Sequence, residues 1–170
     1  QLRTGIAYPR LNVKIAGAYS GLSDSFDGPA HQDPMDIAVV RAMPNMVVVS
    51  VSDALQASRV VEAVAEYEGP VYFRLNRNAV PQVSRETHPF EIGQAVWHQH
   101  GRDVTLIATG IMVAKALGAR ECLESEGIST GVLEIHTLKP IDAEAIMRAA
   151  SESGAIVTAE EHNIYGGLGS

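Results

Sequence analysis

The 170-residue sequence has one cysteine, 5% aromatic residues and no long apolar run, and its formal net charge is −7. The single Cys122 excludes an internal disulfide, and its place in a helical pattern indicates a small buried side chain rather than a nucleophile. The acidic balance leaves no basic face for a nucleic acid. The most apolar runs, residues 46–51 and 104–108, are far shorter than the roughly 20 residues that cross a bilayer. We therefore expect neither nucleic-acid nor membrane partners and, without a visible secretory signal, a cytoplasmic location.

The residues that are present, 46% apolar and 19% charged, are typical of a globular protein with a packed core. In the first half, β-rich runs at residues 12–19, 47–52 and 71–75 predict strands. The run at 47–52 is almost continuously β-branched, which indicates a strand buried on both faces. Asp53 is placed to cap a helix over residues 54–67. A strand, a helix and a further strand in this order predict a parallel sheet with right-handed crossovers.

The second half continues the alternation after a polar connection. Residues 104–108, 129–135 and 155–159 predict strands, and residues 112–125 and 141–150 predict helices. We therefore predict an α/β fold of mostly parallel sheets with helices on both faces. The expected organisation is a first domain over residues 1–80, a linker over 81–89 and a second domain over 90–170 that is incomplete at its C-terminus.

The segment with the clearest chemical potential is Asp27-Gly28-Pro29-Ala30-His31-Gln32, in a loop expected over residues 20–32. It follows a predicted parallel strand, and open α/β sheets bind ligands beyond the carboxyl ends of their strands. The imidazole of His31 can exchange a proton near neutral pH, and the Asp27 carboxylate can hold a hydroxyl group. From composition alone, a self-satisfied Gly-Pro turn is the simpler interpretation. After the loop, Asp33 and Pro34 predict the cap and first turn of a helix.

This motif and several later strings, taken in order, resemble the transketolase family. Asp-Gly-Pro-x-His-Gln at residues 27–32, followed by a helix and Met43-Pro44-Asn45-Met46-Val47, resembles the transketolase signature, which includes the related deoxyxylulose-phosphate synthase. Residues 70–77 (PVYFRLNR) resemble the strand that ends the family's pyrimidine-binding domain. Residues 104–110, 138–142 and 160–170 resemble its C-terminal domain. The resemblance covers essentially the whole chain.

The resemblance implies an incomplete protein. Residues 1–80 would be the C-terminal part of a thiamine diphosphate pyrimidine-binding domain, and residues 90–170 a transketolase C-terminal domain. Glu160-Glu161-His162-Asn163 is similar to split transketolases, in which a second gene carries the diphosphate-binding domain. Because the chain begins at Gln1 and ends in a glycine-rich turn, we expect a fragment that is inactive alone.

In this family, thiamine diphosphate supports the transfer of a two-carbon ketol unit from a ketose phosphate to an aldose phosphate. The implied partner is a diphosphate-binding subunit or domain, in a dimer or an α2β2 assembly. The family's Mg²⁺ clamps the diphosphate on that partner, so no metal ligands are expected in this chain. The glutamate and the aromatic residues that contact the cofactor's pyrimidine ring are expected upstream of Gln1.

By motif position, the resemblance also assigns roles to side chains. His31 would be the catalytic histidine that faces cofactor and substrate oxygens, and Asp27 would bind a substrate hydroxyl. Arg77 would grip the sugar phosphate, a task that suits a guanidinium because it forms two parallel hydrogen bonds. Tyr19 stands where the family usually has a phosphate-binding histidine, and Phe26 replaces a small polar or acidic residue. Either these aromatics change the choice of sugar, or Tyr19 binds the same phosphate through its hydroxyl.

Other interpretations remain open at this point. A deoxyxylulose-phosphate synthase-like enzyme, the β-subunit of a 2-oxoacid dehydrogenase and a non-catalytic assembly module are all alternatives. Two residues apart, His98 and His100 could ligate a metal, but without a matching third ligand we expect solvated side chains. The string Gly166-Gly167-Leu168-Gly169 lacks the dinucleotide fingerprint and predicts a tight turn. Three further histidines are expected as single loop or strand-end residues: His88, His136 and His162.

Overall fold

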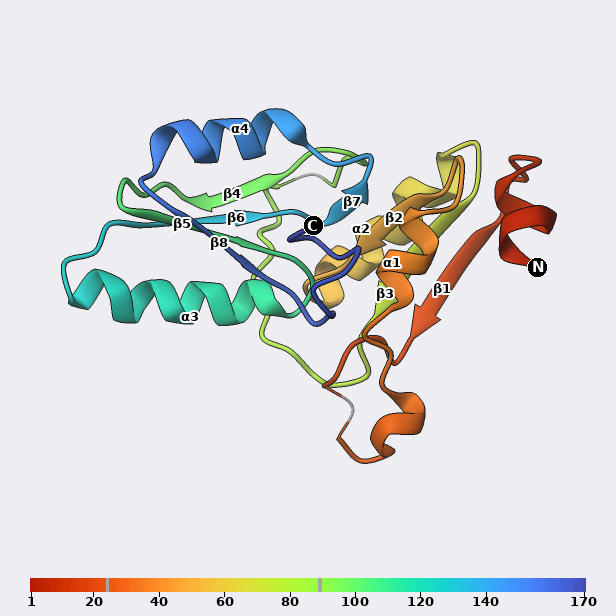
Figure 1. Cartoon of the computed structure of the whole chain (residues 1–170), viewed down its shortest axis with the longest axis horizontal. Coiled ribbons are helices and arrows are strands. Elements are labelled where there is room, and N and C mark those ends of the chain that lie inside the picture. Colours follow the sequence, from red (N-terminus) through yellow and green to blue (C-terminus); the bar gives the residue numbers. More distant parts are fainter. Residues whose placement is uncertain (24, 89) are drawn as a thin grey trace.

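Figure 1 shows the computed structural model, which describes residues 1–23, 25–88 and 90–170 and contains two four-stranded sheets. The strand order is β1-β3-β2-β7 in the first sheet and β4-β6-β5-β8 in the second. Asp24, in the predicted loop, and Pro89, in the predicted linker, lie outside the described residues. In chain order the elements are η1 Arg3–Ala7, β1 Lys14–Ala18, η2 Gly28–His31, α1 Asp36–Arg41, β2 Val47–Ser50, α2 Ala54–Glu66, β3 Val71–Leu75, β4 Val96–Gln99, β5 Val104–Ala108, α3 Met112–Ser125, β6 Thr130–Glu134, β7 Thr137–Lys139, α4 Ala143–Glu152 and β8 Ile156–Ala159.

The predicted parallel sheets with helices on both faces are confirmed. In the first sheet β3 lies between β1 and β2 and pairs parallel with both, and in the second sheet β5 pairs parallel with β6 and β8. Helices α1 and α2 pack against opposite faces of the first sheet through separate apolar clusters. Figure 1 shows α3 and α4 on opposite faces of the second sheet. Across the described ranges, no helix combines the length and apolarity that a membrane crossing requires.

Each sheet ends in one antiparallel edge strand, and the one in the first sheet comes from the second half of the chain. Strand β7 pairs with β2, with Thr137 opposite Val49 and Lys139 opposite Val48. The Lys139 ammonium also donates hydrogen bonds to the carbonyls of Arg41 and Met43. The sequence pattern did not indicate this strand, because three residues are too few to display a period. Strand β7 joins the two halves of the chain through backbone hydrogen bonds.

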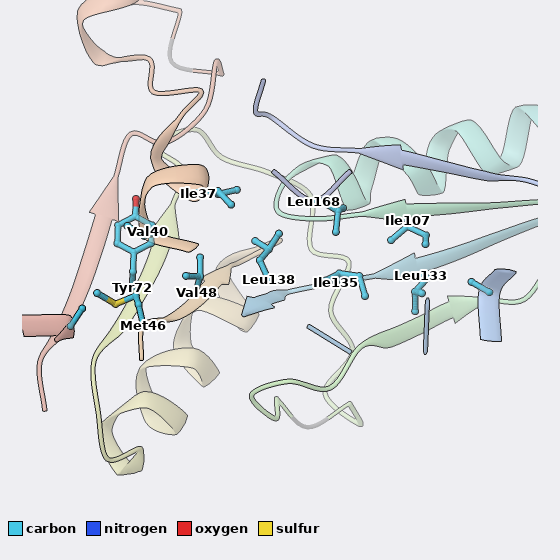
Figure 2. Close-up of a cluster of buried hydrophobic side chains, with 12 residues drawn as sticks. Ile37, Val40, Met46, Val48, Tyr72, Ile107, Leu133, Ile135, Leu138 and Leu168 are labelled. Atoms are coloured by element: carbon cyan, nitrogen blue, oxygen red, sulfur yellow. The ribbon is translucent and has the colours of Figure 1, made fainter. Parts of the chain in front are cut away.

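A shared core also joins the two halves (Figure 2). Ile37, Met46 and Val48 belong to the same buried cluster as Leu133 and other residues of the second sheet. In Figure 2 the labelled side chains extend from Tyr72 and Met46 past Val48 and Leu138 to Ile135 and Leu133. Since this cluster excludes water between the sheets, their relative position is fixed by apolar burial as well as by hydrogen bonds.

Two local predictions of the sequence are wrong. The helix predicted to start at Asp33 and Pro34 starts instead at Asp36, and the Asp33 carboxylate accepts a hydrogen bond from the Met35 amide at 2.9 Å. The cause is non-local, because Asp33 forms bridges with Ser20 and Gly21 that hold its backbone extended. Cys122 is exposed rather than buried.

The prediction that His98 and His100 are solvated is half wrong. His98 is buried, and its Nε2 lies 2.7 Å from the Oε2 of the buried Glu134. His100 is half-exposed and faces Glu152 at the surface. The pairing of β4 with β6 shifts register between Trp97 and Gln99, and such a bulge reorients the side chains that follow it.

His136 lies between β6 and β7, which agrees with the expected strand-end position. Its side chain is nevertheless fully buried, and burial lowers the pKa of its imidazole. The ring packs against Phe90, with centroids 4.4 Å apart. His136 is therefore buried between the chain segment that contains Phe90 and the second sheet.

Candidate functional site

The candidate site lies at the carboxyl ends of β1 and β3 in the first sheet. Tyr19 directly follows β1, and Arg77 lies two residues beyond the end of β3. Asp27 directly precedes η2 and His31 is its last residue, in the loop between β1 and α1, which projects from the sheet at the bottom of Figure 1, in orange. Because parallel strands end at the same edge, chain segments far apart in sequence reach this place together.

Four of the five predicted site residues form one cluster. The Arg77 guanidinium pairs with the Asp27 carboxylate and lies over the Tyr19 ring, 5.2 Å from its centroid. The Tyr19 and His31 rings meet edge to face, with centroids 6.0 Å apart. Arg77 therefore connects the carboxylate to the aromatic side of the cluster.

The cluster is open to solvent. The side chains of Arg77 and Asp27 are 43% and 40% exposed, and Tyr19 is 39% exposed. An ion pair at this exposure stabilises the fold by no more than about 1 kcal/mol, so a ligand can replace either partner at little cost. The arrangement is suited to exchanging internal contacts for contacts with a bound molecule.

Two further features depart from ordinary surface structure. Tyr19 has a φ of 61°, in the left-handed region that is uncommon for residues other than glycine and that concentrates at functional sites. Phe26, the fifth predicted residue, is 88% exposed. The Phe26 ring therefore lies in solvent, where it buries little apolar surface and does not stabilise the fold.

A set of polar residues that the sequence did not single out holds the base of the loop. The Ser20 hydroxyl donates to the Leu75 carbonyl at 3.2 Å. The Asn76 amide donates to the hydroxyl of Ser23 at 3.2 Å and to an oxygen of Glu161 at 3.1 Å. Motif reasoning could not find these residues, since their partners are distant in the sequence.

A buried polar group lies beneath this layer. The Arg74 guanidinium pairs with the Asp36 carboxylate at 3.0 Å, and the Tyr72 hydroxyl donates to the same carboxylate at 2.7 Å. Asp36 opens helix α1, while Arg74 and Tyr72 belong to β3. This group therefore ties the helix that follows the site loop to the central strand of the sheet.

The cluster brings together four functional groups: an imidazole, a carboxylate, a guanidinium and a phenol. These groups can bind a phosphate, orient hydroxyl groups and move a proton. Within residues 1–23, 25–88 and 90–170, no three histidine, cysteine or acidic side chains converge in a way that could hold a metal ion.

The fold, with this cluster at the carboxyl edge of a parallel sheet, is typical of α/β proteins that bind ligands beyond the ends of their strands. Residues 1–82 match the transketolase pyrimidine binding domain, and residues 93–170 match the transketolase C-terminal domain. The chain belongs to the transketolase family.

Relatives and solved structures give the same result. The chain is 41% identical to the 6-deoxy-6-sulfo-D-fructose transketolase subunit SqwH of Clostridium sp., covering 100% of this chain and 53% of the relative. It is also 41% identical to an apulose-4-phosphate transketolase subunit of Phocaeicola vulgatus, covering 99% and 54%. A solved split-gene transketolase, described as an inactive beta4 tetramer, superposes with a TM-score of 0.91 at 47% identity over 98% of this chain and 54% of that one. The chain thus spans about half the length of these relatives.

Proposed function

We propose that this chain is the part of a split, thiamine diphosphate-dependent transketolase that binds the sugar phosphate, and that it takes part in the transfer of a two-carbon ketol unit from a ketose phosphate to an aldose phosphate. The observation that carries the proposal is the assembly of Asp27, His31, Tyr19 and Arg77 into one exposed cluster. Membership in the transketolase family supports the reaction type. A transketolase is favoured over the synthase, dehydrogenase and assembly-module alternatives because the relatives are transketolase subunits.

Each side chain has a task in this proposal. The Arg77 guanidinium exchanges its contact with Asp27 for the sugar phosphate, which it grips with two parallel hydrogen bonds. The released Asp27 carboxylate accepts a hydrogen bond from a hydroxyl beside the reacting carbon. His31 contacts the substrate's carbonyl or hydroxyl oxygen and moves a proton to or from it.

The transketolase family is thiamine diphosphate-dependent, and when bound this cofactor supplies a nucleophilic carbon and an electron sink. The residues of this chain fit the substrate side of such a site: His31 is exposed on the loop and its ring lies beside that of Tyr19. In this proposal Mg²⁺ and the diphosphate are held by a partner subunit or domain, as in split transketolases, where a second gene carries the diphosphate-binding domain.

The assembly we propose contains this chain and a diphosphate-binding partner, as a dimer or an α2β2 tetramer. The relatives named as transketolase subunits support a multi-chain enzyme, and the solved beta4 tetramer is described as inactive. The strong exposure of the Phe26 ring in the site loop is consistent with a contact to the partner or to substrate. Alone, the chain should lack activity.

The identity of the sugar depends on Tyr19 in this proposal. Its ring lies under Arg77, which supports a role in orienting the phosphate-binding group. The two relatives are named for different substrates, 6-deoxy-6-sulfo-D-fructose and apulose 4-phosphate, so variation in this part of the family is expected. Turnover of xylulose 5-phosphate with ribose 5-phosphate tests whether Tyr19 changes substrate choice, since ordinary efficiency would show that it does not.

The central test replaces His31 with alanine in the chain assembled with its partner, thiamine diphosphate and Mg²⁺. We expect kcat/KM for ketol transfer to fall at least about 100-fold, the contribution of a positioned acid–base group. Oligomer size should be unchanged. The control is His100→Ala, since His100 is a half-exposed histidine in the second half of the chain that should not affect turnover.

Two outcomes would contradict the proposal. Wild-type activity in His31→Ala would remove the imidazole from the reaction. Turnover of pyruvate as donor, in place of the ketose phosphate, would point to a synthase instead.

A further inference from the structure

Glu161 lies in the second half of the chain, two residues beyond the end of β8, yet its carboxylate contacts the first half. One oxygen accepts a hydrogen bond from the Leu22 amide at 3.3 Å, and the other accepts from the Asn76 side chain at 3.1 Å. Leu22 belongs to the site loop, whereas Asn76 directly precedes Arg77. A single carboxylate therefore bridges the two segments that carry the candidate site.

The backbone of the loop is shaped to receive this carboxylate. Gly21 has a φ of +79°, and a Cβ at this position would lie 2.7 Å from an oxygen of Glu161. Any other residue here would both strain the backbone and displace the glutamate. The Glu161 carboxylate therefore lies closer to the backbone at position 21 than a residue with a Cβ would allow.

The residues that follow Glu161 hold the other end of the loop. The His162 Nε2 accepts a hydrogen bond from the Ala38 amide at 3.3 Å. The Asn163 side chain donates to the carbonyl of Pro34 at 2.7 Å. Residues 161–163 therefore contact the loop where it leaves β1 and where it enters α1, so the second half of the chain closes around its base.

Asn76 makes the bridge specific to the site. Its amide is shared between Glu161, the hydroxyl of Ser23 and the carbonyl of Ser20. The carboxylate orients this amide, and the amide in turn holds the loop against the end of β3. The separation between Arg77 on one segment and His31 on the other is determined at this point.

We infer that Glu161 is a positioning residue for the site loop, through which the C-terminal domain sets the place of Asp27 and His31 relative to Arg77. Its kinetic consequence rests on the proposed function, whereas its structural consequence does not. Loss of the bridge frees the loop that carries the acid–base group but leaves Arg77 attached to the end of β3. The expected effect is therefore on kcat more than on the binding of phosphate.

The informative variant is Glu161→Gln. The amide has the same shape as the carboxylate, but in either orientation its NH2 group faces a donor, from Leu22 or from Asn76. One of the two hydrogen bonds must break. The matched control is Glu160→Gln, because the adjacent Glu160 carboxylate accepts from the amides of Leu168 and Gly169 and not from the loop.

The first measurement is amide hydrogen exchange in the full chain and in its complex with the partner. In Glu161→Gln, the amides of Gly21, Leu22 and residues 27, 28 and 30–32 should exchange about tenfold faster, as expected for the loss of a charge-assisted hydrogen bond. Exchange in β5 and β6 should not change. Unaltered exchange in the loop would overturn the inference whether or not the enzyme is active.

The second measurement is the division between kcat and KM in the assembled enzyme. We expect kcat to fall about tenfold because the acid–base group is misplaced, while the KM of the sugar phosphate changes less than about twofold. If Glu161→Gln instead caused a general loss of structure, the amount of folded protein would fall, and the control Glu160→Gln would show the same fall. If wild-type enzyme transfers no ketol unit, the proposed function fails and the exchange experiment alone decides the role of Glu161.

Discussion

Arg77 is the residue on which the candidate site converges, because it contacts the Asp27 carboxylate and the Tyr19 ring at the same time. Both contacts are exposed and weak, which suits the proposed role of Arg77, in which it releases one partner to bind a phosphate. The proposed role of Arg77 depends on three properties of the guanidinium: the planar fork, the flat face for stacking and the permanent charge.

The variant Arg77→Lys tests whether the planar shape of the guanidinium is needed in addition to its positive charge. Lysine keeps the positive charge but cannot form two parallel hydrogen bonds or stack in the same way. We expect the KM of the sugar phosphate to rise about tenfold, with a smaller change in kcat. Steady-state kinetics of the assembled enzyme measures this, with Arg120→Lys on the surface of α3 as the control. An unchanged KM would place the phosphate elsewhere.

At the scale of elements, Asp53 has two functions at the start of α2. One oxygen caps the helix by accepting from the Gln56 amide at 2.9 Å, which confirms the predicted cap. The other accepts from the amides of Val83 and Ser84 at 2.8 and 2.6 Å. Burial tends to raise the pKa of Asp53, but these backbone hydrogen bonds outweigh it and leave the pKa below its ordinary value of 3.8. The cap therefore also fastens the connection between the two halves.

Asp53 variants should show this double role. Asp53→Ala should lower the free energy of unfolding by about 2 kcal/mol at pH 7, because a cap and further acceptors are lost. Asp53→Asn keeps an acceptor for the cap but no charge, so it should cost less. Since the folded pKa is depressed, the stability due to ionisation is present above about pH 4 and is lost as the pH falls through the folded pKa. Urea unfolding should therefore show the difference between wild type and Asp53→Asn shrinking as the pH falls below about 4, and a constant difference would contradict this.

At the scale of the whole molecule, a buried polar network complements the shared apolar core. Glu134 in β6 accepts from the Gln56 side chain in α2 at 2.7 Å and pairs with His98 in β4 at 2.7 Å. Burial tends to raise the pKa of Glu134, but hydrogen bonds from His98 and Gln56 outweigh it, so the pKa lies below its ordinary value. A carboxylate of the second sheet is thus held ionised against a helix of the first.

Glu134→Ala should lower the free energy of unfolding by about 3 kcal/mol, because it leaves His98 and Gln56 buried without their partner. Chemical denaturation measures the change, and the loss should appear in one cooperative transition since the network spans both sheets. The control is Glu152→Gln, in an exposed pair with Arg148, which should have no measurable effect. Two separate transitions in the wild type would show that the halves fold independently.

The prediction of the fold from sequence was accurate where local pattern is sufficient. Strand β3, strand β5 and helix α3 have the predicted bounds, because continuous apolar runs and turn residues define them locally. The start of helix α1 and the whole of strand β7 were missed, since each depends on a partner segment distant in sequence. The exposure of Cys122 follows from packing too, because α3 buries Val113 and Ala116 near its start and leaves the later turns more open to solvent.

The sequence by itself determined the family and the alternation of strands and helices, because these depend on residue type and local order. It also predicts which side chains in the loop after β1 could carry chemistry. Only the tertiary structure decided that Arg77 meets Asp27 and Tyr19, that His98 lies buried on Glu134, and that Glu161 reaches the base of the loop. Each of these contacts joins residues that are far apart in the sequence. Their geometry follows from how two sheets pack on one core, which no local pattern contains.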